Sequence, residues 1–359
     1  MRASTALGVP IFSKAKSLQK ANLAYNTDLF LCQRVGQGNI RTNMQEFFTA
    51  LEQVLCTTDI AQKHRAFLDL CDDFYSHRLA IEHSTPLKYI APHINAPIKP
   101  AHHIKKAKLD SHNGLAKALH AIAHIEYSAI TLSLDSAYRF RYLPREYYID
   151  WLRVAGEEFG HFFLLEGLLN ELGAGYGDFA VHSQLYDAML CTNTSLLYRM
   201  GVVHRGLEAR GLDANPFVLQ KFSTLKHPIR SKIQEVLGII LRDEIGHVSR
   251  GDVWWRFALE SAQSARSTHA NPQATNALQD VLQLMQQDLP HPAWQELDSR
   301  LDSSFDSEGV FLALCVRFAD FILCGKIPNT QARLQCGFSQ KEIEKLGRLY
   351  ELCAKHARA

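Results

Sequence analysis

Four glutamates and two histidines along the chain have the residue types and the spacing of a buried metal site. Glu158 and His161 form one Glu-x-x-His motif, and Glu244 and His247 form a second. Residues three apart on a helix point the same way, about one turn from each other. Each motif therefore places a carboxylate and an imidazole on one helix face. This mixture of ligands suits iron or manganese, and the absence of thiolates from it argues against a zinc–sulfur site.

The surroundings of these residues indicate that they are buried. Apolar residues recur at steps of three and four around both motifs, as they do in residues 236–248, which is typical of a helix face turned toward a core. Glu126 lies in a similar apolar stripe, and Glu208 in a weaker one that His204 and Arg205 interrupt. A carboxylate buried without a partner is costly, so each of these glutamates needs a cation, a metal or a proton.

The order of the six residues along the chain adds to their types. Glu126 and Glu158 are 32 residues apart with Pro144 near the midpoint, and Glu208 and Glu244 are 36 apart with a turn near residues 225–229. Each pair fits an antiparallel helical hairpin. Two hairpins packed face to face would gather four carboxylates and two imidazoles, which is the ligand set of di-iron and di-manganese helix bundles. A single Glu-x-x-His arises by chance in helical proteins, so the prediction rests on the whole set.

The elements that must position these residues are all expected to be helices. Periodicity predicts helices over residues 113–139, 144–172 and 228–264, and a further helix that resumes near Gln184, leads through Glu208 and stops at Gly211. His120 and His124 lie on the first of these helices, where each can be a packed histidine or else a ligand or part of a proton relay. The sequence leaves these alternatives open.

An acidic residue precedes each Glu-x-x-His motif, Asp243 in one case and Glu157 in the other. A neighbour at i−1 is rotated by about 100° on a helix, toward the adjacent helix. From there its carboxylate can accept the free N–H of a ligating histidine and fix the orientation of the ring. The alternative for both acids is a position facing solvent.

Length and composition indicate an ordinary globular chain. It has 359 residues, 47% of them apolar and 21% charged, and its net charge of +2 does not demand a polyanionic partner. Eight scattered cysteines without a Cys-x-x-Cys pair are typical of a reducing compartment. There is no run of 18 apolar residues and no clear signal peptide, so we expect no membrane span and a cytoplasmic location.

With these residues in place, the chain resembles the ferritin-like superfamily, and more closely an uncharacterised bacterial ferritin-like family related to the non-haem di-iron tRNA hydroxylases. The segments that carry the resemblance are residues 120–126, 143–146, 157–161, 176–179, 207–213, 241–247, 328–333 and 337–339. The resemblance implies an all-α fold with three parts. These are a helical and irregular extension over residues 1–111, a ferritin-like antiparallel four-helix bundle over 112–264, and a helical extension packed on the bundle over 265–359.

Three functions compete at this point. The first is a dinuclear oxidoreductase of monooxygenase or hydroxylase type, with two iron ions, or manganese or a mixed pair, that activates dioxygen to oxidise a substrate. Glu158 and Glu244 would bridge the ions, and Glu126 and Glu208 would be terminal ligands. The second is an iron-handling or peroxide-detoxifying protein, and the third a metal-free helical scaffold. For the first function we expect a monomer or dimer, and an electron-donor protein as a partner. A tRNA substrate would rest on Arg139, Arg141, Arg145 and the lysines of residues 105–108.

Overall fold

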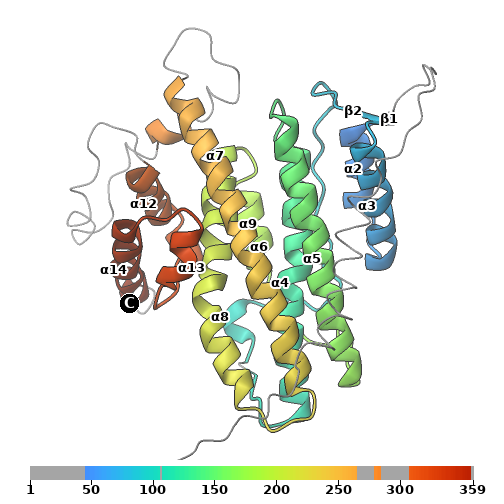
Figure 1. Ribbon diagram of the computed structural model, residues 1–359, viewed down its shortest axis with the longest axis vertical. Coiled ribbons are helices and arrows are strands. Elements are labelled where there is room, and N and C mark those ends of the chain that lie inside the picture. Colours follow the sequence, from blue (N-terminus) through green and yellow to red (C-terminus); the bar gives the residue numbers. More distant parts are fainter. Residues whose placement is uncertain (1–44, 106, 265–278, 284–306, 357–359) are drawn as a thin grey trace, which may run out of the picture. The chain divides into compact units, whose positions relative to one another are not determined.

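The described part of the protein is mostly helical, which confirms the expected all-α class. The structure, a computed structural model, describes residues 45–105, 107–264, 279–283 and 307–356 and divides the chain into two compact units, residues 1–90 and 91–359 (Figure 1). No described helix is both long and apolar enough to cross a lipid bilayer. The divisions predicted after residues 111 and 264 stay predictions, and part of the segments that they delimit lies outside the described residues.

The first unit is a pair of helices joined to a short parallel strand pair. Its elements are β1 (Gln45–Glu46), α2 (Phe47–Cys56), α3 (Ile60–Tyr75) and β2 (Leu79–Ala80). The side chain of Glu46 accepts from the first backbone N–H groups of α2, and Asp59 does the same for α3, because these groups have no partner inside the helix. Buried phenylalanines from both helices form the core, and Lys63 is buried with them.

Four helical segments of the second unit carry all the predicted ligands. They are α4 (His112–Arg139), α5 (Arg145–Glu171), α9 (Arg230–Ser264), and the continuous run of the π-helix η2 (Arg199–Leu207) and α8 (Glu208–Ser223). Helix α4 packs on α5, α5 on α9, and α9 on both η2 and α8; Figure 1 shows the long helices running alongside one another. The observed ends of α4, α5 and α9 lie within two residues of the predicted ones, since each helix has a buried face whose period the sequence reveals.

The segment before Glu208 differs from the prediction of one helix that stops at Gly211. It is divided into α6 (Gln184–Cys191), α7 (Leu196–Tyr198) and η2, and α8 then continues to Ser223. Glycine costs a helix about 1 kcal/mol relative to alanine but does not end it. Pro216 is accommodated in α8 too: it removes one N–H from the helix, and Asn329 donates from Nδ2 to the carbonyl of Leu212 that this leaves free, at 3.3 Å.

The C-terminal segment packs against the same helices. It contains α12 (Ser307–Arg317), η3 (Ala319–Phe321), α13 (Thr330–Gln335) and α14 (Gln340–His356), with α12 against η2 and α13 against α8 and α9. Arg205 of η2 joins these parts. Its fully buried guanidinium is 2.7 Å from Asp252 of α9 and 2.8 Å from Glu342 of α14, and it lies within about 4 Å of the rings of Phe311 and Phe338. A buried arginine is tolerated only when it is paired in this way.

Candidate metal centre

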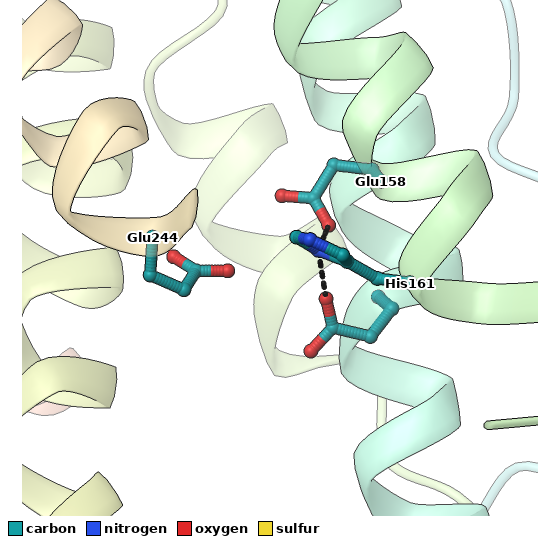
Figure 2. A group of neighbouring side chains, drawn as sticks. Glu158, His161 and Glu244 are labelled. Atoms are coloured by element: carbon teal, nitrogen blue, oxygen red, sulfur yellow. Dashed lines mark hydrogen bonds and ion pairs between the residues drawn. The ribbon is translucent and has the colours of Figure 1, made fainter. Parts of the chain in front are cut away.

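Three helices bring a group of candidate ligands to one point inside the second unit. Glu126 comes from α4, Glu158 and His161 from α5, and Glu244 from α9, and each offers one ligand atom within 4.8 Å of the others. The carboxylate of Glu244 points toward Glu158 and His161 from the facing helix (Figure 2). Glu126, Glu158 and His161 are buried, and Glu244 is partly exposed. The arrangement follows from the sequence, because the turn at Pro144 sets Glu126 level with Glu158.

His161 is surrounded by carboxylates on both sides of its ring. Its Nδ1 is 3.2 Å from Oε2 of Glu126 and 3.3 Å from Oε2 of Glu158, and its Nε2 is 3.2 Å from Oδ2 of Asp243. The ionised carboxylates of Glu158 and Asp243 can only accept hydrogen bonds, so both ring nitrogens must donate. Burial acts to lower the pKa of His161, but these hydrogen bonds outweigh it and raise the pKa well above its ordinary value.

His247 repeats this arrangement from the opposite helix. Its Nε2 is 2.8 Å from Oε2 of Glu157, and its Nδ1 is 3.0 Å from Oε1 of Glu158 and 3.7 Å from Oε1 of Glu244. Burial again acts to lower the pKa, and Glu158 foremost raises it well above its ordinary value. The two acids that precede the motifs thus lie crosswise: Asp243 of α9 meets the histidine of α5, and Glu157 of α5 meets the histidine of α9.

Glu208 faces the same interior from the fourth segment. It lines one cavity together with Glu126, Glu158 and Glu244, although it is not among the four residues whose ligand atoms lie within 4.8 Å. Its Oε1 is 2.9 Å from Nδ1 of His204. Burial and the charge of Glu244 raise the pKa of Glu208 well above its ordinary value. The structure therefore brings all four predicted carboxylates to one cavity. Glu208 contacts His204 and lies outside the group whose ligand atoms converge.

His204 is the residue that sequence reasoning missed. It is fully buried in η2, its ring lies 3.8 Å from that of Trp151, and its Nε2 is 2.9 Å from Oγ of Ser136. Burial lowers its pKa well below the ordinary value, so the ring is neutral, and its contact with Glu208 fixes where that carboxylate points. The four-residue step between His204 and Glu208 was a detectable signal, since residues i and i+4 share a helix face.

The other two histidines near the centre fasten a loop to α4. His120 accepts at Nε2 the backbone N–H of Gly177, at 2.9 Å. His124 lies 2.9 Å from the hydroxyl of Tyr176 at Nδ1 and donates from Nε2 to the carbonyl of His182, at 2.8 Å. Burial lowers the pKa of His124 to about 4. Both side chains therefore have the contacts of packed, hydrogen-bonded histidines, and neither belongs to the group whose ligand atoms converge.

The charges of the centre are unevenly distributed among its glutamates. Burial and the neighbouring Glu158 raise the pKa of Glu126 to about 8. Burial would also raise the pKa of Glu158, but His247 and His161 outweigh it and lower the pKa below its ordinary value. Glu158 is thus ionised between two protonated histidines, whereas Glu126 carries a proton at neutral pH. In this state the protons on His161, His247 and Glu126 balance the negative charge that bound metal ions would otherwise balance.

The atoms that find no partner show whether metal ions would fit. Among the eleven buried side-chain atoms of the described residues that have no hydrogen bond of normal geometry, three lie in the candidate centre: Oε1 of Glu158, Oε2 of Glu208 and Nδ1 of His247. The 3.0 Å between His247 and Glu158 is an ion-pair distance that lacks hydrogen-bond geometry. Buried polar atoms are rarely left in this way. All three belong to the predicted ligands, and oxygen with imidazole nitrogen is the donor set that iron and manganese accept, so the residues fit such ions.

Comparison with known proteins places the chain in a family. The family model described as "Protein of unknown function (DUF455)" matches residues 56–344. The chain belongs to the DUF455 family. A protein of Haemophilus influenzae strain Rd, described as an uncharacterized protein, is 32% identical over 312 residues, which cover 83% of this chain and 93% of that relative. No solved structure matches the chain.

The DUF455 match covers every residue of the candidate centre, from Glu126 to His247. The family description states no fold, ligand or reaction, so the relation to ferritin-like proteins and to tRNA hydroxylases stays a prediction. What this DUF455 chain offers chemically is a buried set of carboxylates and imidazoles, oriented by further acids and by His204, beside an apolar cavity.

Proposed function

We propose that this protein is a ferritin-like, dinuclear non-haem metal oxidoreductase. Glu126, Glu158, His161, Glu208, Glu244 and His247 would hold two ions, of iron or manganese. When bound, such a pair supplies the activation of dioxygen for the oxidation or hydroxylation of a substrate. Di-iron and di-manganese carboxylate bundles take one glutamate from each of two helical segments and one Glu-x-x-His motif from each of two others. Here α4 and η2–α8 supply the single glutamates, and α5 and α9 supply the two motifs.

The position of Glu158 is the observation that carries the proposal. Its Oε2 is 3.3 Å from Nδ1 of His161, and its Oε1 is 3.0 Å from Nδ1 of His247. One carboxylate thus presents one oxygen to each of two imidazoles on facing helices. A site for a single ion does not need the two oxygens of one carboxylate to face different imidazoles, whereas a carboxylate shared between two ions does. Glu158 would therefore help to hold both ions, together with the imidazoles of His161 and His247.

The surrounding residues would orient the ligands and release protons. Asp243 and Glu157 accept from the Nε2 of His161 and His247, which keeps each Nδ1 pointing inward. The Nδ1 protons must leave when metal binds, so metal binding releases protons and weakens as pH falls. His204 would neither orient a ligating histidine nor lose a proton on metal binding. Its neutral ring contacts Glu208 and fixes the position of that carboxyl group.

Metal content tests the proposal. Protein purified without chelator and then loaded anaerobically with ferrous iron is compared with the Glu158→Ala, Glu244→Ala double variant by plasma mass spectrometry. The control is the double variant Glu171→Ala, Glu260→Ala, because these exposed residues lie on the same two helices and change the net charge equally. We expect about two ions per chain in the parent and the control, and almost none in the test variant.

Two outcomes would contradict this function. If the parent binds no stoichiometric metal after loading, the centre is part of a metal-free scaffold. If it accumulates many ions per chain in a large assembly, iron handling replaces oxidation as the function. With two ions bound, dioxygen consumption by the ferrous form, present in the parent and absent from the test variant, is the further result expected of an oxidoreductase.

A further inference from the structure

One apolar cavity leads to the carboxylates of the candidate centre. It has a volume of about 170 Å³, and Glu126, Glu158, Glu208 and Glu244 all line it. Apart from Asn215, the rest of its wall is hydrophobic and comes from α4, α6, η2, α8 and α9, through side chains that include Ile122, Leu132, Val203, Leu237 and Ile240. Three further lining residues, Ile125, Gly211 and Ala214, are exposed, so the cavity opens to the surface between α4 and α8.

The apolar wall of the cavity disfavours charged groups, because they lose their hydration on it. Apart from the four carboxylates, the half-buried Asn215 is the one polar residue among the described residues that line the cavity, and none of them is a lysine, arginine or histidine. A charged group on this wall would lose its hydration without meeting a lysine, arginine or histidine, and only the metal ions that the four glutamates would hold could offset this cost for an anion. An uncharged apolar group instead gains from leaving water.

Of the basic residues on which a tRNA substrate would rest, Lys105 and Lys108 are exposed and Arg145 is half-buried, whereas the two arginines at the end of α4 and just after it are inaccessible. Arg139 and Arg141 are both buried. Arg139 pairs with Asp135 at 2.6 Å, and Arg141 donates to the carbonyl of Tyr138 at 2.7 Å. Neither side chain is at a surface where it would contact the phosphates of a nucleic acid.

The size of the cavity limits what can enter. An engineered apolar cavity of about 150 Å³ in another protein binds benzene, so about 170 Å³ accepts a hydrocarbon group of similar size. We propose that this cavity is the substrate pocket and that it takes an uncharged aromatic or branched aliphatic group. Any charged part of the same molecule stays outside the opening. This inference rests on the proposed function, because it is the metal centre that makes the pocket a substrate site.

Two glycines allow the pocket to be blocked with a matched control. Gly211 of α8 lines the cavity, and a Cβ added to it would meet no atom within 4 Å. Gly238 of α9 is also exposed, and a Cβ added to it would likewise meet no atom within 4 Å, but it does not line the cavity. Gly211→Leu therefore fills the entrance, whereas Gly238→Leu makes the same change on a neighbouring helix. Ala214→Leu, about one turn further along α8, is a second blocking variant should Gly211→Leu fail to fold.

The experiment uses fluorobenzene as the probe, observed by fluorine NMR, with full-length protein in two forms, chelated and loaded with Mn²⁺. We expect saturable binding that toluene displaces and benzoate does not. A blocking variant should weaken the affinity at least tenfold, and Gly238→Leu by less than twofold. In the Mn²⁺ form the bound probe should show strongly enhanced fluorine relaxation, because the cavity ends at the candidate ligands.

The outcomes separate this inference from the function on which it rests. The hydrocarbon pocket is overturned if fluorobenzene shows no saturable binding or if benzoate displaces it as well as toluene does. It is also overturned if a folded blocking variant binds fluorobenzene with the affinity of the parent. Bound fluorobenzene without enhanced relaxation in protein that carries Mn²⁺ overturns its role as the substrate site. Metal content is measured on the same samples. Two ions with no bound probe leave the oxidoreductase standing, and a bound probe with no metal leaves the pocket but removes the oxidoreductase.

Discussion

Glu126→Gln should have opposite effects on stability in the metal-free and the metal-loaded protein. Burial and Glu158 raise the pKa of Glu126 from 4.5 to about 8. At pH 7 the carboxyl is therefore ionised in the unfolded chain and protonated in the folded one. Glutamine has nearly the same shape as the protonated acid and needs no proton. Its amide oxygen can also accept from Nδ1 of His161, which lies 3.2 Å from Oε2 of Glu126.

The magnitude follows from this difference in protonation. Taking up a proton about 2.5 pH units above the unfolded pKa costs about 3 kcal/mol. Because the folded pKa is the higher one, the stability that Glu126 contributes is complete below pH 4.5 and is lost as pH rises through 8. The chelated variant should thus exceed the chelated parent in free energy of unfolding by at most about 3 kcal/mol at pH 7. The difference should approach zero near pH 4.5 and grow up to pH 8.

Metal should reverse the order of the two proteins. An ion at a hundredfold excess over its Kd stabilises the folded state by about 2.7 kcal/mol, and two ions by about 5 kcal/mol. The parent gains this free energy, while the variant lacks one carboxylate ligand and gains less.

The assay is urea unfolding followed by circular dichroism from pH 4.5 to 8, with chelator and with Mn²⁺. The control is Glu260→Gln, an exposed change on α9, which should stay within about 0.5 kcal/mol of the parent. A chelated Glu126→Gln protein that is less stable than the parent, or a difference that does not vary with pH, would refute the reasoning on the charge of Glu126. An order that metal leaves unchanged would refute its role as a ligand.

Two further predictions concern buried charges away from the centre. Burial lowers the pKa of Lys63 from 10.5 to about 8. Because the folded pKa is the lower one, this stability is present above pH 10.5 and lost as pH falls through 8. Lys63→Met should therefore exceed the parent by at most about 3 kcal/mol at pH 7 and lose this advantage by pH 10.5 in urea unfolding. Glu342→Gln leaves the buried Arg205 without one of its two carboxylate partners and should lower the free energy of unfolding by about 3 kcal/mol or more. The exposed Glu344→Gln on the same helix is the control and should be nearly neutral. Equal losses of stability in the two variants would contradict the importance of the pair between Arg205 and Glu342.

Much of the fold could be predicted because α5, α9 and the first half of α4 each have one buried face and one face with exposed residues, whereas residues 130–139 of α4 are all buried. The ends of α4, α5 and α9 follow from that period and from the turns at residues 141–145 and 225–229. The order of the ligands followed too, since two Glu-x-x-His motifs and two spaced glutamates constrain one another. The crosswise positions of Asp243 and Glu157 were expected on the same geometric grounds, and the structure places both within hydrogen-bonding distance of the opposite histidine.

The segment around Glu208 was hidden for a physical reason. Eight of the nine residues of η2 are buried, including Arg199, His204 and Arg205. A helix that is covered on all sides has no apolar stripe, and its π-helical turns depart from the period of 3.6 on which such a search depends. Its polar side chains looked like interruptions because their partners lie elsewhere in the chain. Arg199 pairs with Asp135, and Arg205 pairs with a residue 137 positions away.

These hidden contacts connect the C-terminal segment to the candidate centre. Glu342 of α14 holds Arg205 on η2, His204 is the next residue back along the chain, and its ring holds Glu208 at 2.9 Å. The same π-helix contributes Val203 and Leu207 to the wall of the apolar cavity. A helix whose cationic side chains are fixed from several directions cannot rotate without breaking buried ion pairs. The fourth carboxylate and one wall of the proposed pocket are therefore positioned by residues far along the chain, which explains why a search for local motifs finds the ligands but not what holds them.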